Sequence, residues 1–389
     1  MGRTILLVTV VTLAVMMVIS MFASSTLAQK FSVSDLRILD VLGRNRNYYN
    51  PNWSPDGRKI AFEAVYKKSR QLFVYDVVAN RYREFVSDKK QISSSPRLGP
   101  SVESGFSYRN FGLCWLGSGD WFVYVGSGPY GYHGLYLGDL GNKDQTRISG
   151  SPIVGPDALY MDSPSPHLSG EHVVYRQAEK GNLILRVILN AFNPERRQNT
   201  ALLNKPNMTA AEPSVSPDGD KILFTGVMEG DSNIYLLHVI FREISVDTGE
   251  LFRLTDWPSS ETRARWSPDG QHIAFLSDRS HKQQEALWVM DVDGTEKRML
   301  CNAVVDIDYP EWHPDGRHIF FVKQSGEEKD PICYVDIETG KMETLHTGTY
   351  HNRDLSISKD GKKIALCAFR LEDPTLTWIS LYVADLRGP

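Results

Sequence analysis

Cysteine is scarce in this 389-residue chain, and its few copies are too scattered to form a metal or redox motif. The four cysteines, Cys114, Cys301, Cys333 and Cys367, include no Cys-x-x-Cys pair. Zinc knuckles and thioredoxin-like centres need such pairs, so the sequence excludes both. Each cysteine falls in or beside a predicted strand, where it acts as a small apolar side chain. An oxidising compartment would permit one disulfide, for which Cys333 and Cys367 are the favoured pair.

The chain also lacks a strong charge of one sign and the common catalytic motifs. Its net charge is −4 and it has no long basic stripe, so we expect no nucleic-acid partner. Neither a Gly-x-Ser-x-Gly elbow nor a His-Glu-x-x-His helix occurs, and the ten histidines are scattered. We therefore predict no cofactor, and the sequence favours a protein that is not an enzyme.

A long hydrophobic run occurs at the N-terminus alone. Met1-Gly-Arg3 supplies a positive start, Ile5 to Phe22 is apolar, and Thr26-Leu-Ala28 offers small residues for cleavage. This pattern predicts a signal peptide at residues 1–28 and an exported protein, periplasmic or extracellular. An uncleaved membrane anchor is the alternative, and it would be the one contact with a membrane.

A short phrase recurs along the rest of the chain. The clear copies are Trp53-Ser-Pro-Asp-Gly57, Val215-Ser-Pro-Asp-Gly219, Trp266-Ser-Pro-Asp-Gly270 and Trp312-His-Pro-Asp-Gly316, with weaker copies ending at Gly119, Gly170 and Gly361. We take positions 56, 118, 169, 218, 269, 315 and 360 as anchors; they are 45 to 62 residues apart. A period near 50 indicates a propeller or a solenoid, because one unit cannot cover its own apolar face.

Each unit predicts four short antiparallel strands. Pro-Asp-Gly is turn chemistry, and the runs around it are rich in branched and aromatic residues. The fold class is therefore all-β, a single β-propeller of seven four-stranded blades, or six if a weak copy is not a blade. Four tryptophans lie three residues before an anchor, where packing between blades is favoured over ligand stacking.

The last unit ends at its third strand, Leu381 to Asp385, so its fourth strand must come from elsewhere. The run Leu36 to Leu42 can complete that blade and close the ring, which removes exposed edges. The predicted organisation is a signal peptide at 1–28, a closing strand and lead-in at 29–47, and the propeller at 48–389. We expect a monomer.

The innermost strands begin six to seven residues before each anchor, near one mouth of the central channel. These positions are polar or charged and differ from blade to blade. We therefore predict a ligand-binding mouth formed by Asn50, Asp162, Glu212, Arg263, Asp308, Tyr309, Arg353 and Asp354. Ordinary solvated strand ends around a water-filled funnel are the alternative.

The repeat resembles a known family. Trp266 to Phe275 reads Trp-Ser-Pro-Asp-Gly-x-x-Ile-Ala-Phe, followed by Leu-Ser-Asp-Arg at 276–279 and Leu-Trp-Val-Met-Asp at 287–291. This segment resembles the TolB-type propeller repeat, a WD-like repeat of exported bacterial proteins, and the resemblance covers roughly residues 30–389. It implies the propeller alone, because the α/β domain that precedes the propeller in TolB has no counterpart between the predicted signal and the first repeat.

A second resemblance leaves an enzymatic function as an alternative. Arg46-Asn-Tyr-Tyr49 is loosely similar to the opening of propeller-type oligogalacturonate lyases, which hold a divalent metal with histidines and cleave uronate polymers. It implies His351 as a metal ligand and Arg353 as a charge clamp, and a metal is expected under this alternative alone. The favoured prediction is an exported, non-enzymatic propeller that binds a protein, peptide or glycan at one face. A purely architectural role is the third possibility.

Overall fold

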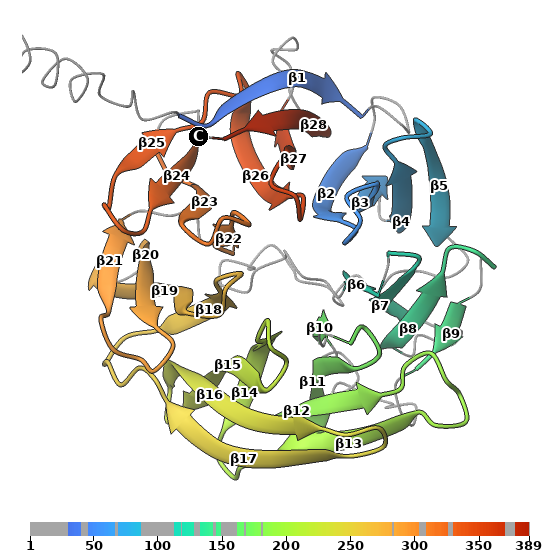
Figure 1. Ribbon diagram of the computed structural model, residues 1–389, viewed down its shortest axis with the longest axis vertical. Helices are drawn as coiled ribbons and strands as arrows, with labels where there is room; N and C mark the ends of the chain where they lie inside the picture. The colour runs from blue at the N-terminus through green and yellow to red at the C-terminus, as the bar shows by residue number, and fades with distance from the viewer. Residues whose placement is uncertain are drawn as a thin grey trace, which may run out of the picture.

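The computed structural model describes residues 30–39, 46–66, 69–86, 113–117, 119–127, 133–142, 145–148, 162–166, 169–179, 182–281, 284–302, 309–325, 330–369 and 378–388. These residues form seven four-stranded antiparallel sheets arranged as blades around a central axis (Figure 1). The prediction of a seven-bladed β-propeller is therefore confirmed. In these ranges no helix is both long enough and apolar enough to cross a membrane. The predicted signal peptide, residues 1–28, lies outside them.

Each blade runs from an innermost strand at the channel to an outermost strand at the rim. Blades 1 to 4 consist of β2 (Asn47–Trp53), β3 (Lys59–Tyr66), β4 (Ser69–Asp76) and β5 (Arg81–Val86); β6 (Leu113–Leu116), β7 (Trp121–Ser127), β8 (His133–Asp139) and β9 (Gln145–Arg147); β10 (Asp162–Pro166), β11 (Val173–Glu179), β12 (Asn182–Leu189) and β13 (Gln198–Leu203); and β14 (Thr209–Val215), β15 (Lys221–Met228), β16 (Asp231–Phe241) and β17 (Val246–Arg253). Blades 5 to 7 consist of β18 (Glu261–Trp266), β19 (His272–His281), β20 (Gln284–Asp291) and β21 (Arg298–Cys301); β22 (Glu311–Trp312), β23 (His318–Val322), β24 (Ile332–Asp336) and β25 (Met342–Thr344); and β26 (Tyr350–Ile357), β27 (Lys363–Phe369), β28 (Ile379–Arg387) and β1 (Ser32–Ile38).

The repeated Ser-Pro-Asp-Gly phrase builds the turn between the two innermost strands of a blade. In blade 5 the Ser267 hydroxyl donates to Asp269 at 2.5 Å and accepts the backbone N–H of His272 at 2.9 Å. Gly270 closes the turn with a φ of 72°, a conformation that suits glycine. The serine and aspartate therefore recur because their side chains satisfy the backbone of the hairpin.

The tryptophans before the anchors tie neighbouring blades together. Each of the four is buried and donates its indole N–H, at 3.0 to 3.3 Å, to a backbone carbonyl in the innermost strand of the preceding blade. The pairs are Trp53 with Ser356, Trp115 with Asn52, Trp266 with Ser214, and Trp312 with Arg265. The predicted role in packing between blades is confirmed.

Two seams without a tryptophan use a side chain of the preceding blade instead. The backbone N–H of Val215 donates to the Ser165 hydroxyl at 3.1 Å, and that of Ile357 donates to the Glu311 carboxylate at 3.0 Å. Each acceptor lies four residues before its own anchor, the same register as the carbonyls that receive the indoles. The residue four positions before the anchor thus accepts the hydrogen bond between blades in all six of these seams, with its backbone carbonyl in four of them and with its side chain in two.

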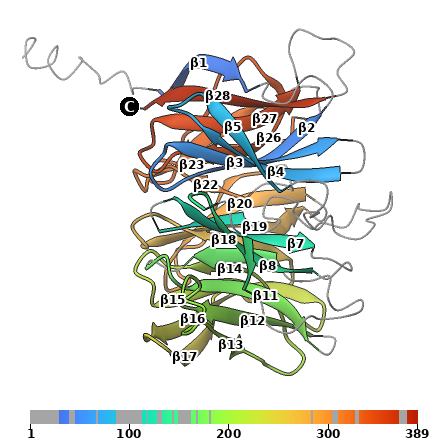
Figure 2. The same cartoon turned by 90° about the vertical axis from the view of Figure 1, so that its right-hand side faces the viewer.

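The N-terminal strand closes the ring, as predicted, but over different residues. Strand β1 pairs antiparallel with β28, with Ser32 opposite Arg387 and Ile38 opposite Tyr382, and the two run side by side at the rim (Figures 1 and 2). The strand begins at Ser32, four residues before the predicted run of 36–42, and ends at Ile38, while residues 40–42 of that run lie outside the described part of the chain. The prediction followed an apolar run, whereas an outermost strand is largely exposed. Phe31, just before β1, is the buried anchor instead.

All four cysteines are buried free thiols. The disulfide that an oxidising compartment would permit between Cys333 and Cys367 is therefore not formed. The two side chains belong to different core clusters, because Cys333 packs between blades 5 and 6 and Cys367 packs between blades 7 and 1. The prediction that the four cysteines act as small apolar side chains is confirmed.

Candidate functional site

A polar cavity of about 450 Å³ lies along the axis of the ring. Its lining includes one residue from each blade at the same register, four positions before the anchor. These seven residues are Asn52, Cys114, Ser165, Ser214, Arg265, Glu311 and Ser356. Because every blade contributes, the cavity exists in the closed ring alone.

A bulge in the innermost strands shapes the cavity. In blade 1 the pairing steps from Tyr49 with Glu63 to Asn52 with Ala61, which leaves one extra residue on the inner strand. The same shift occurs in blades 3, 4, 5 and 7. An extra residue bends a strand and redirects its side chains. The bulge therefore decides which side chains of each inner strand reach the channel.

The residue six positions before the anchor takes a left-handed conformation in four blades. The φ angles are 52° at Asn50, 54° at Glu212, 56° at Arg263 and 48° at Asp354. Asn and Asp tolerate this conformation, whereas Glu and Arg adopt it when surrounding contacts hold them. In blades 4 and 7 the acidic side chain accepts the backbone N–H of the equivalent residue in the next blade. These contacts are Arg263 N to Glu212 at 2.8 Å and Asn50 N to Asp354 at 3.4 Å.

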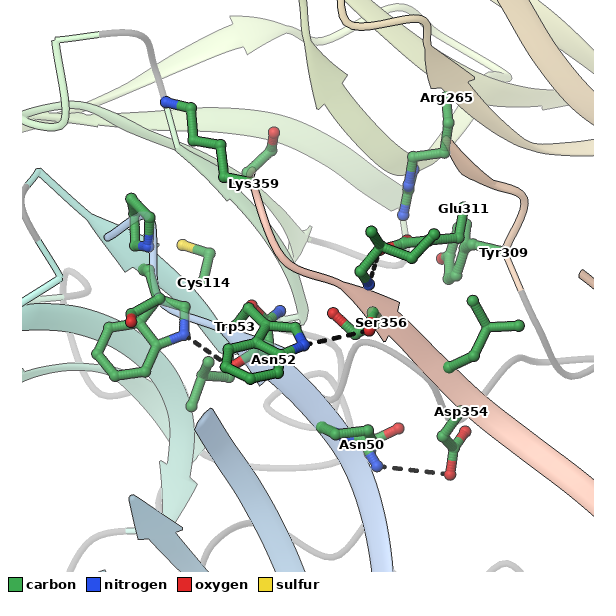
Figure 3. Close-up of a pocket in the computed structure, with 18 of the residues that line it drawn as sticks. Asn50, Asn52, Trp53, Cys114, Arg265, Tyr309, Glu311, Asp354, Ser356 and Lys359 are labelled. Carbon is green, nitrogen blue, oxygen red and sulfur yellow. Dashed lines mark hydrogen bonds between the residues drawn. The ribbon is translucent and has the colours of Figure 1, made fainter. Parts of the chain in front are cut away.

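Blades 4 to 6 share a polar network beside the cavity. Glu212 also accepts the Thr225 hydroxyl at 2.9 Å and the Tyr309 hydroxyl at 3.4 Å. The Arg265 guanidinium lies 3.7 Å from the centre of the Tyr309 ring, in a cation–π contact. In Figure 3, Arg265, Tyr309 and Glu311 gather on one side of the cavity. The guanidinium charge of Arg265 is therefore stabilised by the Tyr309 ring.

The side of the cavity at the seam between blades 7 and 1 is acidic. Asp354 and Glu63 both line the cavity and are 6% and 4% exposed. Asn50 lies between the two blades and lines the cavity as well (Figure 3). The cavity therefore has two carboxylates at the seam of blades 7 and 1, and an arginine, a tyrosine and a third carboxylate, that of Glu311, at blades 5 and 6.

The structure brings three of the predicted mouth residues to the cavity: Asn50, Tyr309 and Asp354. Glu212 and Arg263 lie behind it, where Glu212 joins the network above and Arg263, 2% exposed, forms an ion pair with Glu285. Arg353 is not among the lining residues and pairs with Cys367 on the next strand. Asp162 begins β10, the position of its side chain lies outside the described part, and Asp308 lies outside it entirely. Ligand binding by these residues stays a prediction.

His351, the candidate metal ligand, lies away from the cavity. Its Nδ1 is 3.4 Å from the Asp330 carboxylate and its ring packs edge-on against Phe369. Among the described residues, no group of three or more His, Cys, Asp or Glu side chains is placed to hold a metal ion. The His351 side chain thus has a structural role, in which it links β26 to the loop that carries Asp330.

Sequence reasoning missed the ring of residues four positions before the anchors. It followed the start of each inner strand, and the bulge places the cavity lining two residues further on. A signal was available in three of the bulged blades, where Pro51, Pro164 and Pro213 lie five positions before the anchor, inside the bulge. A proline inside a strand marks an edge or a bulge, so this spacing indicates where side chains are redirected.

A buried acid beside the mouth predicts a pH dependence of stability. Glu261, at the start of β18, is fully buried, and burial raises the pKa of its carboxyl above the usual 4.5. Because the folded state has the higher pKa, the protonated acid stabilises the fold below the unfolded value, and this stability is lost as pH rises through the folded value. Glu261→Gln, which can still accept from Ser259 and Ser277, should raise the free energy of unfolding at pH 7 by about 1 kcal/mol.

The measurement for Glu261 is denaturant unfolding of both proteins at neutral and acidic pH. Near pH 4 the gain should vanish, because the wild-type carboxyl is then protonated. A gain of equal size at both values would contradict an ionisation effect at this residue.

The TolB beta propeller domain model matches residues 153–382. A curated relative, the uncharacterized peptidase YuxL of Bacillus subtilis (strain 168), is 26% identical over 169 residues, which are 41% of this chain and 22% of that protein. The chain thus spans less than a quarter of the length of this relative. The similarity is limited to the aligned 169 residues, so the activity of the whole relative is not transferred to this chain.

Solved structures of enzymes share the fold. A puromycin-hydrolyzing peptidase of Mycobacterium tuberculosis superposes with a TM-score of 0.65 at 14% identity, covering 93% of this chain and 55% of that chain. An oligogalacturonate lyase in complex with manganese gives 0.61 at 14% identity, covering 93% of this chain and 97% of that chain. Identities this low establish the propeller architecture and leave the chemistry of the site to its own residues. Since the family model covers more than half of the chain and the described strands form its propeller, the chain belongs to the TolB beta propeller domain family.

Proposed function

We propose that this protein is an exported, non-enzymatic β-propeller that binds a protein, peptide or glycan partner at one face of the ring, through the central cavity. The carrying observation is that side chains from all seven blades converge on one polar cavity of about 450 Å³. Binding sites are typically concave, with a few polar groups held by a rigid scaffold. Three lining side chains, those of Ser165, Glu311 and Asp354, also accept hydrogen bonds between blades, and the variety of polar groups in the lining as a whole suits recognition of a partner.

Export is supported by the sequence of residues 1–28, which has the three parts of a secretory signal. The protein would then act in the periplasm or outside the cell. A ring that closes on itself suits a monomer, because β1 covers the edge of blade 7 that could otherwise pair with another chain.

The test blocks the cavity without removing a contact between blades. Ser214→Trp and Ser356→Trp each place a large side chain in the lining, while their backbone carbonyls still receive the indoles of Trp266 and Trp53. Each variant should reduce partner capture at least about tenfold, since a filled pocket excludes the group that enters it. Capture is measured with immobilised protein against a periplasmic extract, and the captured species is identified by mass spectrometry.

The matched control is Ser280→Trp, which adds the same side chain at an exposed position of blade 5 and should leave capture unchanged. Capture that survives in both blocked variants with unchanged unfolding temperatures would rule out the cavity as the binding site. The lyase alternative is tested with polygalacturonate and Mn²⁺. Release of an unsaturated uronide, seen by its ultraviolet absorbance, would replace the non-enzymatic proposal.

A further inference from the structure

The tryptophans between blades leave some side chains of the cavity without a structural role. At a seam with a tryptophan, the indole N–H bonds to the backbone carbonyl of the residue four positions before the anchor. The residues held in this way that carry a neutral polar side chain are Asn52, Ser214 and Ser356. At the seams where Ser165 and Glu311 replace the tryptophan contact, the side chain itself forms the bond. The tryptophans therefore free three side chains for another use.

These three side chains, which we call the neutral triad, are available to a ligand. Asn52, Ser214 and Ser356 line the cavity and are partly exposed. Among the described residues, none of the three side chains has a hydrogen-bond partner. An amide and a hydroxyl can each donate and accept. Because the indoles fix their backbone carbonyls, the triad is held in position before a ligand binds, which lowers the entropy that binding costs.

Asn50 adds a fourth neutral group. Both polar atoms of its amide are shielded from solvent, and within the described part of the chain neither has a hydrogen-bond partner. Its backbone is held in the left-handed conformation, with its N–H toward the Asp354 carboxylate at 3.4 Å. An amide without partners is costly inside a fold. Turned toward the cavity that Asn50 lines, this amide would gain a donor and an acceptor from a ligand.

The charged groups of the lining are mostly engaged within the fold. The charged lining residues that interact with other parts of the chain are Glu63, Arg265, Glu311 and Asp354. Lys359 is exposed, lies just before the last anchor, and extends away from Asn50 and Asp354 in Figure 3. A charged ligand group would lose its water and meet groups that are already paired, which is unfavourable. The available chemistry of the cavity is therefore neutral hydrogen bonding.

We propose that the ligand is a neutral, hydroxyl-rich saccharide unit bound by the neutral triad. This choice rests on the proposed function and narrows it to a glycan. Asn52 and Ser356 belong to neighbouring blades, and Ser214 belongs to a blade across the ring (Figure 1). The hydroxyls of a sugar project around its whole edge, so one unit can reach both sides, whereas a peptide bond offers one donor and one acceptor. The cavity of about 450 Å³ is within the range of about 300 to 1,000 Å³ for small-ligand sites.

The probe is a glycan array in which each neutral saccharide is paired with its uronate counterpart. Labelled wild-type protein should bind neutral members, and each uronate counterpart should bind at least about tenfold more weakly, because its carboxylate is desolvated without compensation. Affinity should change less than about twofold between low and high salt, since no ionic contact is formed. Titration with free disaccharides identifies the source: a free sugar binds on its own, whereas the end of a longer glycan binds on the array alone.

Alanine variants of the neutral triad test the residues themselves. Asn52→Ala, Ser214→Ala and Ser356→Ala should each weaken binding of the selected saccharide about three- to tenfold, the effect of one neutral hydrogen bond. Their unfolding temperatures should stay unchanged, because these side chains bond to no other described residue. Ser280→Ala, at an exposed position of β19, is the matched control and should bind as the wild type does.

The outcomes distinguish this inference from the proposed function. A preference for uronate members that disappears in Lys359→Gln overturns the neutral saccharide, and so does saccharide binding that is unchanged in all three alanine variants. An array without any bound member overturns it as well. In that case, capture of a polypeptide without a glycan that Ser356→Trp excludes leaves cavity binding standing, whereas capture that survives in both tryptophan variants removes the proposed function too.

Discussion

Trp266→Ala is expected to lower the free energy of unfolding by about 3–5 kcal/mol, the usual cost of truncating a buried tryptophan. The side chain is 8% exposed and packs among residues of blades 4 and 5, including Leu223, Leu236 and Phe275. Its indole N–H also donates to the Ser214 carbonyl at 3.0 Å, so truncation leaves that carbonyl unpaired. The loss should appear as a lower denaturant midpoint.

Two controls divide this effect into its parts. Trp266→Phe keeps most of the apolar contact and loses the hydrogen bond, so it should cost about 1–2 kcal/mol. Trp378→Ala truncates a tryptophan that is 40% exposed and should stay within about 0.5 kcal/mol of wild type. If Trp266→Ala were as mild as Trp378→Ala, the tryptophans would not hold the blades together.

The fold was predictable because the same hairpin pattern occurs seven times in the sequence. Turn chemistry at Ser267 to Gly270 and the apolar runs beside it define a hairpin, and the recurrence of that hairpin requires a closed or stacked array. The weak copies near 118 and 169 still form blades 2 and 3. Their apolar strands pack against each other in one core cluster, and this packing does not require the full turn motif.

The site was less predictable because it depends on bulges in the inner strands of blades 1, 3, 4, 5 and 7. A bulge changes which side chains face the channel, and sequence alternation alone does not reveal it. Glu212 and Arg263 do not line the cavity, although they share a register and a left-handed backbone with Asn50 and Asp354, which do. Ser165 and Ser214, two small and ordinary residues, line the cavity because of their position, and no unusual chemistry marks them in the sequence.

The closing strand predicts the second large effect: Phe31→Ala should cost about 3–5 kcal/mol and loosen the N-terminal strand. Phe31 is 5% exposed, and its ring lies edge-on to His313, His318, Phe320 and Tyr334 of blade 6, with ring centres 4.9 to 5.0 Å apart. Strand β1 itself is mostly exposed, so this one ring provides much of the apolar burial at its start. Chemical denaturation measures the loss, and limited proteolysis of the N-terminal segment reports the loosening.

The neighbouring residue provides the control for Phe31. Lys30→Ala removes an ion pair with Glu343 at 2.8 Å, in which the lysine is largely exposed, and should cost under about 1 kcal/mol. The backbone hydrogen bond from Phe31 to the Tyr334 hydroxyl, at 3.2 Å, remains possible in both variants, so the difference between them isolates the ring. Because Phe31 contacts blade 6 while β1 pairs with blade 7, its loss should weaken two blades at once and broaden the unfolding transition. A sharp transition with an unchanged midpoint would mean that the ring closes through the pairing of β1 with β28 alone.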